Sequence, residues 1–231
     1  MAFELMARGA SVIVADHDDV AAEDVVARAR GQGHCAVAYS CDVRDPAEIG
    51  ALFTAIARDA GRLDALVNNA GVFPRVTLQQ TTTEALDDVV SVNFRGAVLC
   101  TTAAMPLLAP AKGMVVFIGS SAAEATTLDA GTAPYFQLYG ASKAALERWA
   151  LGTAPALAAV GVTAVVVRPG RPLLTDGVLA MDLPAEELSQ YVDPAFVGVA
   201  IGWLLAQQPA AWTGRLLSAR DFGSSWGDAR A

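Results

Sequence analysis

The chain has 231 residues, of which 54% are hydrophobic and 17% charged, so it is long and apolar enough to fold around a large core. Its 24 acidic residues outnumber 16 Lys and Arg and give a net charge of −8, which argues against a general nucleic-acid-binding protein, since phosphate binding needs a basic surface. We expect no membrane span, because no stretch approaches ~20 consecutive apolar residues, and no signal-peptide pattern opens the sequence.

The cysteines and histidines point away from metal and triad chemistry. Cys35, Cys41 and Cys100 are odd in number and lack metal-ligand spacing, which predicts reduced thiols, a cytoplasmic location and no metal site. Only His17 and His34 are present, so a catalytic triad built on histidine is not expected.

Apolar runs of strand length alternate with helical patterns along the whole chain. The expected strands are 11–15, 36–40, 65–67, 114–118, 162–167 and 214–218. The expected helices are 3–8, 20–30, 46–60 with Asp45 as its N-cap, 84–108, 139–159 and 194–206. This alternation predicts an α/β fold in which helices cover both faces of a parallel sheet, and the lack of a linker or repeat predicts one domain over residues 1–231.

Polar residues follow the predicted strands directly. Asp16, Asp42, Asn68, Ser120 and the pair Pro169-Gly170 all stand where a strand ends. In such sheets ligands bind in the crevice beyond the carboxyl ends of the strands, so these residues are candidates for a binding site.

One further pair suggests proton transfer. Tyr139 and Lys143 are four residues apart and therefore share one face of the predicted helix. A cation beside a phenol favours the phenolate and lowers its pKa, which lets tyrosine exchange a proton with a substrate oxygen. The same spacing also arises by chance, so the pair gains meaning only together with the other motifs.

These motifs occur in an order that resembles the short-chain dehydrogenase/reductase family over nearly the whole chain, from Met1 to about Gly214. They are Asn68-Asn69-Ala70-Gly71, Asn93 within Ser91-Val92-Asn93-Phe94, Ser120, Tyr139-x-x-x-Lys143 and Pro169-Gly170. The resemblance implies a three-layer, Rossmann-like doubly wound sheet. It also implies NAD(P)(H)-dependent interconversion of a secondary alcohol and a ketone.

The resemblance assigns a role to each catalytic position. Tyr139 would be the acid/base, and Lys143 would lower its pKa and bind the nicotinamide ribose. Ser120 would hold the substrate oxygen, and Asn93 would take part in a proton relay through Lys143.

The resemblance also assigns the cofactor contacts. Asp16 would bind the adenosine ribose, which favours NAD over NADP because a carboxylate repels a 2′-phosphate. The remaining cofactor-binding positions would be Asp42, Val43, Asn68, Ala70, Gly71, Tyr139, Lys143, Pro169 and Gly170.

Simpler interpretations stay open for several of these residues. Asp16 could cap the following helix, Asp42 could be a turn residue, and Asn93 could be an amide that bends a helix. Position 121 is also serine, so Ser121 competes with Ser120, which we prefer because the strand is the rigid reference.

The chain departs from the family pattern at its front. We find neither the first strand nor the glycine-rich turn that receives the pyrophosphate, and this strand would lie between strands 12–15 and 65–67. Two bare strand edges and weakened dinucleotide affinity are therefore expected, whether the start is shortened or natural. The alternative function is a non-catalytic relative that is retained for binding or assembly; a nucleotide-sugar epimerase or dehydratase, which uses the same Tyr-x-x-x-Lys pair, is a third option.

The sequence between the motifs suggests the substrate pocket and the partners. Residues 122–138, with Phe136, are expected in the wall of the pocket, and residues 171–193 in a mobile lid, although an ordinary connection between helices is the alternative. The pocket is expected to be small and apolar. Small residues on helices 84–108 and 139–159 suggest a homodimer or homotetramer, or else only packing against the sheet.

Overall fold

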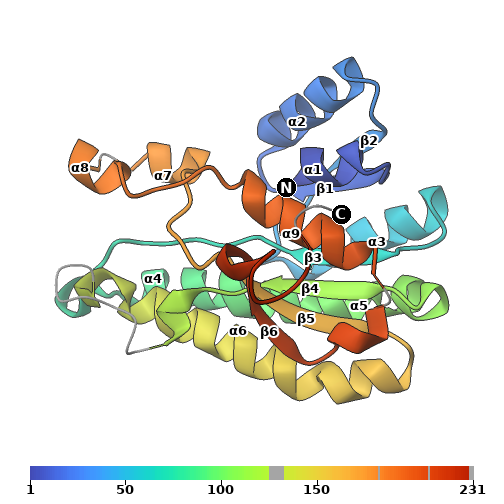
Figure 1. The fold of residues 1–231 in the computed structure, drawn as a ribbon. Helices are drawn as coiled ribbons and strands as arrows, with labels where there is room; N and C mark the ends of the chain where they lie inside the picture. The colour runs from blue at the N-terminus through green and yellow to red at the C-terminus, as the bar shows by residue number, and fades with distance from the viewer. Residues whose placement is uncertain (125–132, 182, 208, 229–231) are drawn as a thin grey trace.

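A computed structural model describes residues 1–124, 133–181, 183–207 and 209–228 (Figure 1). The strands are β1 (Val12–Asp16), β2 (Ala36–Ser40), β3 (Ala65–Asn68), β4 (Met114–Ile118), β5 (Thr163–Arg168) and β6 (Arg215–Ser218). The helices are α1 (Ala2–Ala7), α2 (Asp19–Gly31), α3 (Pro46–Asp59), α4 (Thr83–Val90), α5 (Ala97–Ala111), α6 (Ala133–Ala159), α7 (Asp176–Leu179), α8 (Ala185–Leu188) and α9 (Ala195–Leu205).

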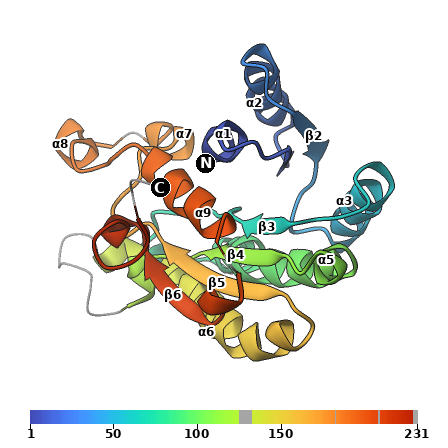
Figure 2. The ribbon, with the colours of Figure 1, turned by 45° about the vertical axis from the view of Figure 1, so that its right-hand side comes forward.

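The strands form two separate parallel sheets. One contains β3, β4, β5 and β6 in that order, and the other pairs β1 with β2 (Figure 2). The predicted α/β architecture is therefore confirmed. Within the part of the chain that the structure describes, no strand bridges β1 and β3, so each has an unpaired edge where the sequence predicts a missing strand.

Both faces of the four-stranded sheet are covered, which explains why its strands are continuous apolar runs. Phe117 of β4 is fully buried against α5 and α6, where it packs with Leu108 and Leu146. Val116, the neighbouring residue, points to the other face and is equally buried against Ile201 of α9. Successive residues of a strand face opposite sides, so both must be apolar here.

The β1–β2 sheet has its own small core with α1 and α2. Its buried residues include Met6, Val26 and Ala29. Helix α1 joins this part to the rest by packing on α9, as Figure 2 shows. Close approach requires glycine on α9, because a Cβ at Gly198 would lie 2.9 Å from the Cα of Met1, and one at Gly202 would lie 2.7 Å from the Cδ of Arg8.

A continuous helical run connects β3 with β4, as expected. It consists of α4, a π-helical segment at Ser91–Gly96, and α5. Within the run Thr83–Ala111, an 18-residue window has a mean hydropathy of 1.3, so by length and composition alone the run could cross a membrane, which corrects our expectation that no segment approaches this limit. Because Cys100, Ala104 and Leu108 belong to the core on the sheet, we assign the run to the protein interior.

Two local expectations can be compared with the structure directly. Asp45 is the N-cap of α3, where its side chain accepts a hydrogen bond from the Ala47 amide, so this prediction is confirmed. Helix α6 begins at Ala133 and not at Tyr139, which places Phe136 on the helix. Residues 125–132 of the predicted pocket wall lie outside the described part of the chain.

Candidate functional site at the carboxyl ends of β4 and β5

Ser120, Tyr139 and Lys143 converge beyond the end of β4. The Ser120 side chain lies close enough to the Tyr139 phenol to act on it through hydrogen bonding, which works to lower the pKa of the phenol. The Lys143 Nζ lies 5.8 Å from the centre of the Tyr139 ring and donates to the Ile118 carbonyl at 2.9 Å. Lys143 is only 3% exposed, so one face of α6 presents a phenol and an ammonium beside the strand end.

Asn93 anchors the neighbouring loop through the π-helical segment. Its Oδ1 accepts from the Val72 amide at 2.7 Å, and its Nδ2 donates to the Val72 carbonyl at 2.9 Å and to the Ser142 hydroxyl at 3.0 Å. The side chain is 1% exposed. The structural interpretation of Asn93 is thus supported, since the π turn lets one amide tie the segment after β3 to α6.

Burial controls the protonation of this group. Desolvation raises the pKa of Tyr139, although hydrogen bonding with Ser120 acts in the opposite direction. Burial likewise lowers the pKa of Lys143 to about 8. Lys143 is not among the causes that act on the pKa of Tyr139 here, so its role in lowering that pKa stays a prediction.

Ser120, rather than Ser121, is the serine at this site. Ser120 acts on the Tyr139 phenol, and its hydroxyl also accepts from the Ala122 amide at 3.2 Å. Ser121 is exposed. The preference for Ser120 agrees with this geometry, because the rigid strand β4 delivers it.

Small residues lie beside these side chains. Ala70 and Gly71 are exposed, and a Cβ at Gly71 would lie 3.5 Å from the Asn93 Oδ1 and 3.6 Å from the Lys143 Nζ. Gly170 has a φ of +75° and could not carry a side chain without strain, since a Cβ would lie 2.7 Å from the Ser218 Oγ. Pro169, just before it, is half-buried, and its carbonyl accepts from the Arg220 amide. The assignment of these positions to the nicotinamide end of a cofactor stays a prediction.

Asp16 lies at the end of β1 with a half-exposed carboxylate. Its Oδ1 accepts from the Asp18 amide at 3.1 Å and lies 2.9 Å from the His17 ring. Asp18, not Asp16, caps α2 by accepting from Ala21. The interpretation of Asp16 as a helix cap is therefore wrong, and the carboxylate faces solvent where a ligand can reach it.

The other residues expected to bind the cofactor, at the ends of β2 and β3, already make contacts with other residues of the protein. Asp42 pairs with the Arg44 guanidinium, which lowers the pKa of Asp42. Val43 packs so closely that a Cβ on Gly96 would lie 2.9 Å from it. Asn68 donates to the Thr101 hydroxyl at 3.0 Å in the interior. The Asp42 carboxylate is thus engaged within its own turn, and the Asn68 amide nitrogen is engaged in the interior, so contacts of either residue with a cofactor stay predictions.

Comparison with known proteins identifies the family. The model of the short chain dehydrogenase family matches residues 1–181 of this chain. The chain belongs to the short-chain dehydrogenase/reductase family. A short-chain type dehydrogenase/reductase of Picea abies is 34% identical over 188 residues, which are 76% of this chain and 66% of that protein. The chain therefore spans about two thirds of the length of that relative.

Solved structures agree with the fold. A short chain dehydrogenase from Burkholderia cenocepacia J2315, in complex with NADP, is 28% identical and has a TM-score of 0.81, with 99% of this chain and 93% of that chain covered. A blue fluorescent protein from a metagenomic library, in complex with NADPH, has a TM-score of 0.82 at 28% identity, with 94% and 89% covered.

The short-chain dehydrogenase/reductase motifs did not indicate the aromatic and charged residues around Tyr139. The Phe73 ring centre lies 5.1 Å from that of Tyr139 and 4.7 Å from that of Phe136. Arg75 stacks on Tyr135 at 4.6 Å and pairs with Glu187 of α8. Phe136 was already expected in the pocket wall from the sequence, whereas for Phe73 and Arg75 only the residue types of segment 71–77 could have given a signal.

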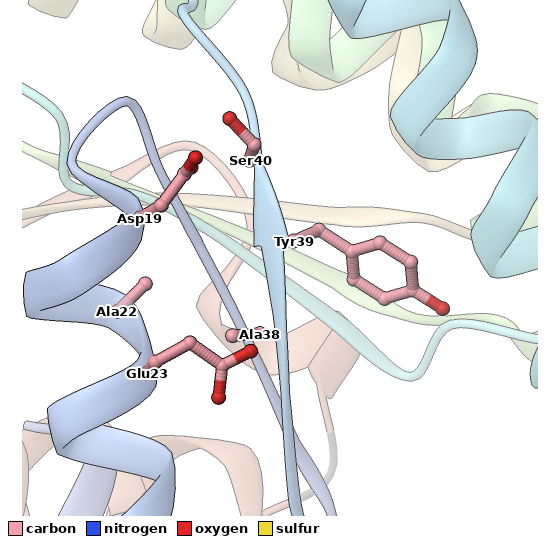
Figure 3. A pocket seen from close by; sticks show the side chains of 6 residues that line it. All are labelled: Asp19, Ala22, Glu23, Ala38, Tyr39 and Ser40. Atoms are coloured by element: carbon pink, nitrogen blue, oxygen red, sulfur yellow. The ribbon is translucent and has the colours of Figure 1, made fainter.

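A hollow of about 200 Å³ lies elsewhere, between α2 and β2 (Figure 3). Its lining includes the carboxylates of Asp19 and Glu23 from the helix, with Tyr39 and Ser40 from the strand. Two carboxylates make it unsuited to a phosphate group. Among the described residues, no cluster of three or more His, Cys, Asp or Glu side chains could hold a metal ion.

Proposed function

We propose that the chain catalyses the NAD(P)(H)-dependent interconversion of a secondary alcohol and a ketone. The observation that carries this proposal is the approach of the Ser120 side chain to the Tyr139 phenol, with the Lys143 Nζ 5.8 Å from the centre of the same ring. An oxygen bound between the two hydroxyls would meet a hydrogen-bond donor and a proton-exchanging phenol. Family membership supports the reaction class.

In the oxidation direction the phenolate form of Tyr139 would accept the proton of the substrate hydroxyl, which regenerates the phenol, while Ser120 steadies the oxygen. In reduction the phenol returns the proton to the ketone oxygen. The bound nicotinamide supplies or accepts the hydride. Lys143, whose pKa is lowered to about 8, holds the end of β4 through Ile118 and lies where a nicotinamide ribose would reach it.

Asn93 is proposed as part of the proton relay that reaches Lys143. Its Oδ1 and the Lys143 Nζ both lie within 3.6 Å of the position that a Cβ on Gly71 would take, so they face the same small space. Its fixed hydrogen bonds with Val72 and Ser142 keep the amide in one orientation. Asn93 is therefore well placed to order the surroundings of the lysine.

The substrate is proposed to be small and apolar. Phe73 and Phe136 pack edge to face with Tyr139, and their ring centres lie 5.1 and 6.2 Å from its ring centre. Such a wall offers dispersion contacts and few hydrogen-bond partners. A hydrophobic ring or short chain bearing one hydroxyl or carbonyl suits it.

NAD(H) is our proposed cofactor. The Asp16 carboxylate is 49% exposed at the end of β1, where it would accept bonds from ribose hydroxyls and repel a 2′-phosphate. Ala70, Gly71, Pro169 and Gly170 would line the nicotinamide end, and Asp42 and Val43 the adenine end. The relatives solved with NADP and NADPH argue for the other cofactor, so both must be measured on this chain.

Replacing Tyr139 with Phe tests the proposed reaction. The variant keeps the ring in its aromatic contacts and removes the hydroxyl, so turnover should fall at least ~10³-fold with the fold intact. Tyr39→Phe is the matched control, since that hydroxyl bonds to Asp59 on the surface, away from the site. Steady-state rates with a panel of cyclic and short-chain alcohols provide the measurement, and full activity in Tyr139→Phe would exclude the role.

The unpaired edges of β1 and β3 favour a second candidate, a non-catalytic relative retained for binding or assembly. Binding of NAD(H) or NADP(H) raises the melting temperature of the folded protein by mass action. Thermal melts with both cofactors therefore separate the candidates: no shift with either favours the non-catalytic protein. A larger shift with NADP(H) than with NAD(H) would overturn the cofactor preference.

A homodimer or homotetramer is the proposed assembly. Ala145 of α6 is exposed, whereas Ala104 and Ala150 are buried within the chain itself. The alternative of packing against the sheet is thus correct for Ala104 and Ala150, and a partner copy can use only the outer face. Light scattering on the purified chain measures the state directly.

A further inference from the structure

A buried carboxylate lies behind the proposed catalytic group. Glu147 is on α6, one turn beyond Lys143, and is 5% exposed. Charged side chains are rarely buried unless they are paired, so this residue requires a specific explanation. Neither the family motifs nor the proposed reaction gives it a role.

The contacts of Glu147 reach the ends of two strands. Its Oε1 accepts from the Ser120 amide at 3.0 Å and from the Arg168 Nε at 2.8 Å, and its Oε2 accepts from the Arg168 Nη2 at 2.5 Å. Arg168, the last residue of β5, is 11% exposed at its side chain and also pairs with Glu124. The two hydrogen bonds from the Arg168 guanidinium compensate the buried negative charge of Glu147, and the Oε1 atom still accepts the bond from the Ser120 amide.

Gly119, the residue that follows β4, lies in direct contact with the Glu147 carboxylate. A Cβ at Gly119 would lie 2.4 Å from the Glu147 Oε1, so only glycine permits this approach. One turn earlier on the same helix, Lys143 donates to the Ile118 carbonyl. Helix α6 thus holds residue 118 and residue 120 at two points, and Tyr139 projects from the same helix toward Ser120.

We propose that Glu147 is a positioning residue, which holds Ser120 within reach of Tyr139 and links the buried ion pair with Arg168 to the reaction at that site. The inference rests on the proposed function. It adds a residue that touches no reactant but sets the distance between two groups that do. A displacement of about 1 Å in such a site can lower a rate about 100-fold.

The charge of Glu147 also acts on the neighbouring titratable groups. It raises the pKa of Tyr139 and the pKa of Lys143, both of which burial perturbs more strongly. The charged groups that face it are Lys143 on its own helix and Arg168 from β5, with Glu124 beyond Arg168. Removing the negative charge therefore favours the phenolate of Tyr139, and the acid limb of alcohol oxidation should move to lower pH.

The test compares Glu147→Gln with Glu124→Gln. Both remove one carboxylate charge from the same guanidinium, but only Glu147 contacts the Ser120 amide. We expect Glu147→Gln to lower kcat by up to about 100-fold and to lower the pKa of Tyr139, with little change in either for Glu124→Gln. The phenol is titrated by ultraviolet absorbance as the difference from the same chain carrying Tyr139→Phe.

The phenol titration needs neither cofactor nor turnover, so it separates the two proposals. If the wild type is inactive but the pKa of Tyr139 falls in Glu147→Gln, the proposed function is wrong, and the effect of the Glu147 charge on Tyr139 is still supported. A pKa and a kcat unchanged in folded Glu147→Gln overturn the inference. If that variant does not fold, hydrogen exchange of the Ser120 amide in the wild type decides: slow exchange supports the bond to Glu147, and rapid exchange contradicts it.

Discussion

The four-stranded and two-stranded sheets of this chain are built from similar residues and reach different degrees of burial. In β4, Val115, Val116 and Phe117 are all fully buried. In β1, Val12, Ile13 and Val14 are only half-buried, although they form a strand with the same apolar pattern. The difference lies in the neighbours, because β4 is paired on both sides and β1 on one. Strand formation is therefore local, whereas burial depends on the surrounding sheet.

The same division separates the proposed chemistry from the proposed recognition of adenosine. Asn93, Ser120, Tyr139 and Lys143 are held by the four-stranded sheet and its helices. Asp16 belongs to the two-stranded sheet, which reaches the rest through α1 on α9. The reacting groups can thus stay rigid while the adenosine end moves, and the following experiments test this contrast.

The largest effect is expected at Lys143, whose burial lowers its pKa from 10.5 to about 8 and so destabilises the folded state by about 3 kcal/mol. Lys143→Met removes this cost but leaves the Ile118 carbonyl without its donor. We expect the variant to be about 1–3 kcal/mol more stable than the wild type at pH 7 and to lose turnover. Chemical denaturation measures the first and steady-state kinetics the second.

The pH dependence has a definite sign. Below about pH 8 both states carry the Lys143 charge, and the penalty is complete. Between about 8 and 10.5 the folded state has lost the proton and the unfolded state has kept it, so stability contributed by this group rises with pH. The raised pKa values of Tyr139, Cys41 and Cys100 make the protein less stable as the pH rises, which opposes the effect of Lys143. The effect of Lys143 is therefore obtained as the difference in unfolding free energy between the wild type and Lys143→Met. If the unfolding free energies of the wild type and Lys143→Met differ by the same amount from pH 7 to 10, the lowered pKa of Lys143 is contradicted.

A second experiment makes the same substitution in each sheet. Val116→Ala in β4 empties a fully buried site and should lower the free energy of unfolding by about 2–3 kcal/mol. Val14→Ala in β1 removes a half-buried side chain and should cost about 1 kcal/mol. Urea denaturation gives both values, and hydrogen exchange shows where each acts. Equal costs would mean that β1 is packed as firmly as β4.

The sequence was sufficient for much of the fold and for the centre of the site. Each strand except its ends could be predicted, because apolar runs bounded by Gly, Pro and Asp are local signals. The shared helix face of Tyr139 and Lys143 and the place of Ser120 at a strand end came from the residues, whereas their meeting was implied by the resemblance to the family. The gap between β1 and β3 could also be predicted from the absent first strand.

What could not be predicted depends on burial or on distant partners. Glu147 looks like a solvent-facing helix residue until Arg168 is brought against it from β5. The raised pKa of Tyr139 reflects desolvation, which no spacing of residues reveals. The π-helical segment at Asn93 gave no signal beyond an asparagine inside a helix, and its shape becomes clear only from the bonds with Val72.

The smallest effect is expected in the proposed lid, of which residues 171–181 and 183–193 are described. The Arg75 Nη1 lies 2.5 Å from the Glu187 Oε1 of α8, and both side chains are about one quarter exposed. A partly exposed pair of this kind contributes about 1 kcal/mol, so Glu187→Gln should raise local opening of the lid about fivefold. Hydrogen exchange of residues 183–192 measures this opening, and the double variant with Arg75→Met should add little to the single one.

Arg62→Met is the control, because the pair of Arg62 with Asp64 is as close but lies on the surface far from the lid. If the segment is an ordinary connection held by its own turns and by the bridge between Leu173 and Val192, neither variant will change its exchange. If the ion pair keeps the segment closed, Glu187→Gln and Arg75→Met will speed its hydrogen exchange, whereas Arg62→Met will not. Added salt will then raise the exchange rate of the wild type toward that of the two variants. The contrast between the two sheets then extends to the proposed binding regions. The proposed adenosine end is loosely attached because β1 and β3 are not paired with each other, whereas the proposed substrate end opens when the ion pair between Arg75 and Glu187 breaks.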